Sequence, residues 1–93
     1  MKYMEFEWDP KKSDTNKRKR GVTFQEGTTI FGDPLAITFA DPDHSVEEAR
    51  RITFGQSIQK RLLVVSHTNR GSRTRIISAR LMTRKERKIY EQG

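Results

Sequence analysis

The stretch that decides the fold reads Lys60-Arg-Leu-Leu-Val-Val-Ser-His-Thr-Asn-Arg-Gly-Ser-Arg-Thr-Arg-Ile-Ile-Ser-Ala-Arg80. Leu62–Val65 is the longest unbroken aliphatic run of the chain, and Thr74–Ala79 is a second β-prone run. Between them, Asn69-Arg70-Gly71-Ser72 predicts a tight reversal, because Asn and Gly tolerate the positive φ that such a turn needs. Two such runs around a short loop predict an antiparallel hairpin.

Helix and strand signals continue on both sides of this hairpin. Asp9 is a good N-cap, Gly21 is typical of a helix end, and Thr23 and Thr83 are each followed three residues later by Glu, which predicts two capping boxes. Alternating apolar residues predict strands elsewhere. The order is therefore β-α-α-β-β-β-β-α, a single small α+β domain with a mainly antiparallel sheet. The predicted elements outside the hairpin are strands 2–7, 35–40 and 51–58 and helices 10–20, 24–31 and 84–92.

Composition limits what this chain can do. At 93 residues, with 32% hydrophobic and 33% charged side chains, it can build one modest core under a highly charged surface. The absence of cysteine excludes a disulfide scaffold and any thiolate zinc site. No apolar run reaches 18 residues, and residues 1–8 lack the apolar region of a signal peptide. We therefore expect a cytoplasmic protein.

Positive charge is concentrated at the C-terminal end. Residues 60–93 carry ten basic and two acidic side chains, whereas residues 22–59 carry two basic and six acidic ones, within a net charge of +7. A basic pole of this kind suits a polyanion such as nucleic acid. A solvated surface that keeps the protein soluble is the alternative explanation.

Several kinds of catalytic site find little support. The two histidines, His44 and His67, lie far apart in sequence, and Asp41 and Asp43 beside His44 are more typical of a turn than of a metal site. Nucleophile motifs with a positioned acid and glycine-rich phosphate loops are absent. The sequence thus predicts no metal and no cofactor.

RNA cleavage makes smaller demands, because the substrate supplies its own 2′-OH nucleophile. The enzyme must orient the phosphate, move protons and neutralise the developing charge. Arginine suits the last task and histidine the second. The first hairpin strand is expected to end in His67 and the second in Arg80, with Tyr90 available to stack on a base. The basic candidates beside them are Arg73, Arg75, Arg80 and Arg84.

Strand alternation restricts this constellation. It places Arg75 and Arg80 on opposite faces of the sheet unless a bulge intervenes. Arg80 can stand beside His67 at only one register of the two strands. The all-apolar run Leu62–Val65 predicts cover on both faces of the hairpin, by the N-terminal helices on one and the C-terminal helix on the other. The site is then expected at the rim where the hairpin meets residues 83–90. Each of these side chains also has a purely structural interpretation, through packing or surface ion pairs.

An ordered set of short motifs resembles one known family. The chain is similar to the BrnT-type toxins of bacterial type II toxin–antitoxin pairs, which have a RelE-like ribonuclease fold. The matching pieces are Phe6–Pro10, Lys12, Asn16, Lys19–Gly21, Val22–Phe24, Phe31–Pro34, Asp41–Ser45, Glu48–Arg50, Gly55, Leu62–Thr68, Arg75–Arg80, Arg84–Arg87 and Tyr90.

The resemblance implies a metal-independent endoribonuclease that inhibits translation and growth. It also implies a BrnA-type antitoxin, a small DNA-binding protein expected to have a ribbon-helix-helix fold, through which the pair would reach its operator. Carried over by position, the expected catalytic residues are His67, Arg80, Arg84 and Tyr90. The expected substrate-binding residues are Arg75, Lys12, Lys19 and Arg50, although the two lysines also fit plain surface charge.

One position departs from the family pattern. The family commonly has Lys-His-Gly where this chain has Lys19-Arg20-Gly21. If that histidine contributes to catalysis, this chain is expected to be weak or inactive; if it only caps a helix, Arg20 replaces it. A non-catalytic nucleic-acid-binding module and a protein-interaction domain therefore stay open as alternatives.

Overall fold

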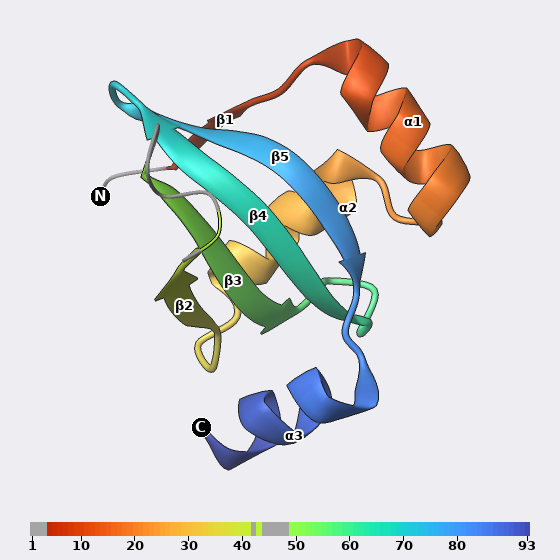
Figure 1. Cartoon of the computed structure of the whole chain (residues 1–93), viewed down its shortest axis with the longest axis vertical. Coiled ribbons are helices and arrows are strands. Elements are labelled where there is room, and N and C mark those ends of the chain that lie inside the picture. Colours follow the sequence, from red (N-terminus) through yellow and green to blue (C-terminus); the bar gives the residue numbers. More distant parts are fainter. Residues whose placement is uncertain (1–3, 42, 44–48) are drawn as a thin grey trace.

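The structure is a computed structural model that describes residues 4–41, 43 and 49–93. It contains a five-stranded sheet with three α-helices and one 3-10 turn (Figure 1). In chain order the elements are β1 (Glu5–Glu7), α1 (Pro10–Arg20), α2 (Phe24–Thr28), the 3-10 turn η1 (Thr29–Gly32), β2 (Ile37–Ala40), β3 (Arg50–Gln56), β4 (Leu62–Arg70), β5 (Arg73–Leu81) and α3 (Arg84–Gln92). The predicted α+β class and element order are confirmed.

The hairpin of β4 and β5 lies at the centre of the sheet. The strand order is β1-β5-β4-β3-β2, with antiparallel pairing throughout except for β1, which runs parallel to β5. The hairpin strands are longer than predicted, since β4 continues to Arg70 before the turn at Gly71 and Ser72. The central position explains the unbroken aliphatic run, because strands between neighbours have two faces to bury.

One sheet face, which we call the α2 face, carries the main core. Figure 1 shows α2 and η1 behind the sheet, and Phe24 and Ile30 from these two elements are fully buried against Leu63 and Val65 of β4. A Cβ at Gly55 of β3 would stand 2.9 Å from the Cβ of Ile30. Glycine at this position therefore lets η1 approach the sheet closely.

The opposite face, which we call the α3 face, carries a smaller core. Phe54 and Val64 pack there with Met82, and Tyr90 of α3 packs against this cluster. Cover on both faces of the hairpin is thus confirmed. The cover is uneven, because α3 lies beyond one end of the sheet (Figure 1) and has no fully buried residue.

Most element boundaries follow the predicted caps. Helix α1 begins and ends as predicted, with the Asp9 side chain accepting from the Lys11 amide and Gly21 in the left-handed conformation at φ 71°. The predicted helix 24–31 changes to a 3-10 turn after Thr28. The strand predicted from residue 35 begins at Ile37, because the amides of Leu35 and Ala36 are held by Asp33 in a turn.

Parts of other predictions fall outside the described residues. They are the start of the first predicted strand at residues 2 and 3, Pro42, His44, Ser45 and Glu48. Among the helices that the structure describes, none combines the length and apolar character that a membrane span requires.

Candidate nucleic-acid interface

Helix α1 lies along the edge of β5 and is held there by one side chain. The Asn16 amide donates to the carbonyls of Ala79 and Val22, both at 2.8 Å, and its oxygen accepts from the Ala79 amide at 3.2 Å. Asn16 thereby forms the hydrogen bonds that a neighbouring strand would form with β5. Because α1 has no buried residue, this contact positions a polar helix against the sheet without an apolar interface.

A bulge in β5 sets which side chains share a face. Ser66 pairs with Ser78 and His67 pairs with Ile76, so Ile77 is an extra residue in β5. Ile76 and Ala79 consequently both reach the core of the α2 face, which strict alternation forbids. Arg75 and Arg80 share the α3 face, where their register partners are Thr68 and Val64. The bulge that would allow Arg75 and Arg80 to share a face is therefore present.

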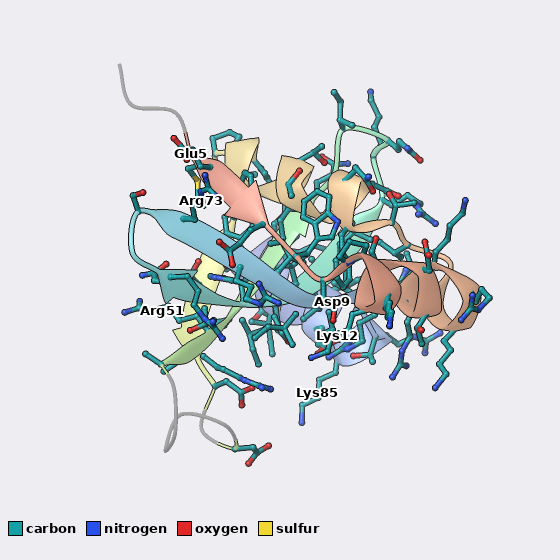
Figure 2. All side chains as sticks on the ribbon, turned by 90° about the horizontal axis from the view of Figure 1, so that it is seen from above. Glu5, Asp9, Lys12, Arg51, Arg73 and Lys85 are labelled. Atoms are coloured by element: carbon teal, nitrogen blue, oxygen red, sulfur yellow. The ribbon has the colours of Figure 1, made fainter. Side chains whose placement is uncertain are left out.

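Two adjoining hollows follow the line between α1 and β5, and we call them together the α1–β5 groove. They share Lys19 and Arg20 at the end of α1, so they adjoin there. Within the described part of the chain, the lining has five cationic side chains and no carboxylate. The lining residues are Lys11, Lys12, Thr15, Asn16, Lys19, Arg20, Ile77, Ser78, Arg80, Leu81 and Thr83. Figure 2 shows Lys12 beside Asp9 at the start of α1, and Lys85 extending away from the sheet on the side of α3.

Arg80 enters the groove from β5 in a fixed orientation. Its Nη1 and Nη2 donate to the two carboxylate oxygens of Glu86 at 2.7 and 2.8 Å, and Nη1 also donates to the Leu81 carbonyl at 3.3 Å. The hydrogen bonds from Arg80, opposed by partial burial and assisted by Thr83, lower the pKa of Glu86 to about 2. The carboxylate therefore stays ionised throughout the pH range in which proteins work.

His67 lies outside this groove, on the α2 face of the sheet. It is 5% exposed, its ring meets the edge of Phe31 at a centroid distance of 4.9 Å, and its Nε2 is 2.7 Å from the Thr53 hydroxyl. Burial and then the nearby charge of Arg51 lower its pKa to about 4. The predicted register that would bring His67 beside Arg80 is wrong, because Arg80 pairs with Val64 and points to the opposite face.

The other candidate residues are distributed over the α3 face. Tyr90 donates its hydroxyl to Asp33 at 2.6 Å, and burial together with this bond raises the Tyr90 pKa to about 12. Arg75 donates to Glu7 at 2.7 Å. Arg84 is exposed at the first position of α3, and Arg50 is half-buried at the start of β3. The structure thus brings Lys12, Lys19 and Arg80 together but leaves His67 and Tyr90 outside the groove.

The sequence did not predict four residues that line the groove or contact its lining. They are Lys11, Arg20, Ser78 and Glu86. A signal for the first two was available in α1, since residues 11, 15 and 19 and residues 12, 16 and 20 follow the i, i+4 spacing of one helix face. Ser78 and Glu86 had no such signal, because their placement depends on the bulge and on the docking of α3. Across residues 4–41, 43 and 49–93, no group of three or more His, Asp or Glu side chains is placed to hold a metal ion.

Comparisons with known proteins agree with this architecture. Residues 8–86 match the model of the family described as the ribonuclease toxin BrnT of type II toxin–antitoxin systems. The chain belongs to this family. The BrnT match includes all of α1 and β5 and ends at Glu86, so it covers the whole α1–β5 groove. It makes the protein a ribonuclease toxin by family, and such a toxin has an antitoxin partner.

Among solved structures, the chain is similar to the crystal structure of the ribonuclease toxin BrnT from Brucella abortus. The TM-score is 0.68 at 22% sequence identity, over 88% of this chain and 100% of the other. This likeness shows that the BrnT fold is shared. A comparison with curated protein sequences finds no match.

Proposed function

We propose that the α1–β5 groove is the RNA site of this BrnT toxin and that Arg80 is its main catalytic residue. The groove itself carries the proposal, because its two hollows have no carboxylate among their described lining residues. Five cations line them: Lys11, Lys12, Lys19, Arg20 and Arg80. Such a lining attracts a phosphate backbone, and Arg80 adds a planar donor edge suited to a phosphate that gains charge. Lys12 and Lys19 thus act in substrate binding, as the sequence predicted.

In this proposal the reaction is a metal-independent transesterification. The 2′-oxygen of the ribose forms a bond to phosphorus while the bond to the 5′ oxygen breaks, which leaves a 2′,3′-cyclic phosphate and a 5′-hydroxyl. Arg80 stabilises the charge on the non-bridging oxygens, and the groove lysines hold the phosphates in line. A lysine ammonium supplies the proton that the leaving 5′ oxygen takes up.

Proton removal from the 2′-OH follows from what the lining lacks. Among the residues that the structure describes, the lining contains no histidine and no carboxylate, the groups that most often accept a proton near neutral pH. We propose that the proton passes to hydroxide, so that the cleavage rate increases with pH. His67 and Tyr90 then act in stability rather than in catalysis, because each is held by another side chain away from the groove.

A paired set of variants tests the RNA site. Lys19→Ala/Arg20→Ala removes two cations that line the groove, and Lys17→Ala/Arg18→Ala removes two cations from the same helix turn that do not. Both double variants lose the same net charge. Purified protein is expected to cut RNA in EDTA and to leave cyclic phosphate ends, with the first pair strongly impaired and the second close to wild type.

Two outcomes would count against the RNA site. Equal impairment of the two double variants would show that only overall charge matters. Salt-sensitive RNA binding with no cleavage over a wide protein range would favour the non-catalytic binding module instead.

The partner proposed for this toxin is a BrnA-type antitoxin with a ribbon-helix-helix DNA-binding fold, acting in the cytoplasm. The cations of the groove support a contact in which an acidic segment of such a partner covers the groove. Co-expression with the product of the adjacent gene is expected to yield a stable complex that no longer cuts RNA. A neighbouring protein without a DNA-binding pattern, or a complex that keeps full activity, would contradict this assignment.

A further inference from the structure

We propose that Glu86 is a positioning residue that fixes which edge of the Arg80 guanidinium meets the phosphate. The inference rests on the proposed RNA site and adds a residue that does not line the groove. The two carboxylate oxygens of Glu86 occupy the edge formed by Nη1 and Nη2, and the Leu81 carbonyl takes the outer hydrogen of Nη1. The direction of the guanidinium is thereby set from two sides.

Counting the donors shows what is left for a ligand. A guanidinium has five N–H groups, and three of those of Arg80 are used by Glu86 and Leu81. The remaining two are Nε–H and the outer Nη2–H, which lie side by side on one edge of the plane. For these two donors the structure gives no protein partner among the described residues. Arg80 therefore offers a two-donor edge of the kind that binds two phosphate oxygens.

Glu86 is itself held in place at the start of α3. Its Oε1 accepts from the Thr83 amide at 2.8 Å, and its own amide donates to the Thr83 hydroxyl at 3.2 Å, which completes the capping box. The side chain of Glu86 is 19% exposed, whereas that of Arg80 is 37% exposed. The carboxylate thus links the orientation of a groove residue to the rigid first turn of a helix.

Positioning and plain electrostatics predict opposite results for loss of this charge. A carboxylate next to a groove for a polyanion weakens RNA binding by repulsion, so neutralising it should tighten binding. If charge were its only effect, cleavage would increase together with affinity. If Glu86 orients Arg80, affinity is retained or improved while kcat decreases, because misplaced catalytic groups lose rate more than binding.

A double-mutant cycle on the full chain tests this split. The proteins are wild type, Glu86→Gln, Arg80→Lys and the double variant, each assayed for KM and kcat on one RNA. Gln keeps the size of the side chain but has one acceptor oxygen, and Lys has no planar edge to orient. In the wild-type background Glu86→Gln is expected to lower kcat by about 10- to 100-fold without raising KM. In the Arg80→Lys background it is expected to change kcat by less than about 3-fold, since the two residues act as a unit.

Equal kcat losses in both backgrounds, or a Glu86→Gln protein as fast as wild type, would overturn the inference. An inactive wild-type protein would instead contradict the proposed function, and a second measurement then decides about Glu86. The Arg80 Nε–H resonance is followed by NMR during titration with a 2′-O-methyl oligonucleotide, which cannot be cleaved through its 2′ position. A shift in wild type that disappears in Glu86→Gln supports positioning, and a resonance that does not respond in wild type rejects it.

Discussion

Two helices of this toxin begin with the same motif and use it differently. Thr23 and Glu26 start α2, and Thr83 and Glu86 start α3. At α3 the capping box is complete, and Glu86 also holds Arg80 beside the groove. At α2 the Thr23 hydroxyl accepts from the Glu26 amide, but the Glu26 carboxylate is turned into the protein.

The buried carboxylate of Glu26 has its own arginine. It accepts from Arg61, whose Nε is 2.9 Å away, and from the Ser57 hydroxyl at 2.7 Å, and its side chain is 3% exposed. The hydrogen bond from Arg61, opposed by burial, lowers the pKa of Glu26. The predicted capping box at α2 is therefore wrong for the Glu26 side chain, which binds Ser57 and Arg61 instead of the helix start. One Thr-x-x-Glu motif thus buries its carboxylate in an ion pair, while the other orients a groove residue.

The largest expected effect is on the α3 side. Arg80→Ala is expected to reduce kcat/KM by about 100- to 1,000-fold, the usual loss when one transition-state donor is removed. The free energy of unfolding is expected to fall by less than about 1 kcal/mol, since the Arg80–Glu86 pair is partly exposed. Cleavage assays and urea unfolding on the same preparation measure both, with Arg87→Ala on exposed α3 surface as the matched control. A loss of activity in Arg87→Ala of the same size would break the distinction.

The α2 side is expected to show the reverse. Arg61→Ala leaves the Glu26 carboxylate buried without its cation, and we expect a loss of roughly 3 kcal/mol in the free energy of unfolding. The partial exposure of Arg61, at 36%, places this near the lower end of such losses. At a temperature where the variant is still folded, kcat should be close to wild type. A folded Arg61→Ala protein with strongly reduced kcat would show that the two arginines do not divide stability and activity.

Acid should sharpen the contrast through His67, which also lies on the α2 side. Its pKa is about 4 in the folded protein, below the ordinary value of 6.5. Its contribution to stability is therefore fully present above pH 6.5 and is lost as the pH falls from there towards 4, by roughly 2 kcal/mol or more. Urea midpoints in His67→Gln, whose side chain does not titrate, should depend less on pH in this window. The pH–rate profile near pH 6.5 should be the same in both proteins.

The smallest effect is expected at Tyr90. Tyr90→Phe removes the hydrogen bond to Asp33 and should cost about 1 kcal/mol of stability by loosening the end of α3. The Glu86 carboxylate at the start of the helix is untouched, so kcat should change by less than about 3-fold. A decrease in kcat as large as that of Arg80→Ala would return Tyr90 to the catalytic residues.

Local signals predicted the fold well because they act over a few residues. Each helix cap and the hairpin turn depend on side chains within a few positions, so they could be predicted and they indicated the element order. They are the caps at Asp9, Gly21 and Thr83 and the turn near Gly71. The partner of Glu26 could not be read in this way, because Arg61 follows 35 residues later. The strand on which Arg80 lies was also predictable.

The candidate site was less predictable because it depends on register and on one irregularity. The sequence does not show that Arg80 pairs with Val64 rather than lying beside His67. It also does not show where β5 breaks its alternation. Lys12 and Lys19 could be proposed from the family resemblance together with their charge, whereas the role of Arg20 depends on the end of α1 facing β5.

The extra residue in β5 has a consequence for how this chain tolerates changes of length. Elsewhere in a paired strand, deleting one residue inverts the facing of every side chain beyond it. Ile77 is unpaired between Ile76 and Ser78. Its deletion would therefore restore regular alternation and leave Ala79 on the α2 face and Arg80 on the α3 face. Insertions and deletions among relatives of this toxin are therefore expected to be tolerated at this point of the strand before any other.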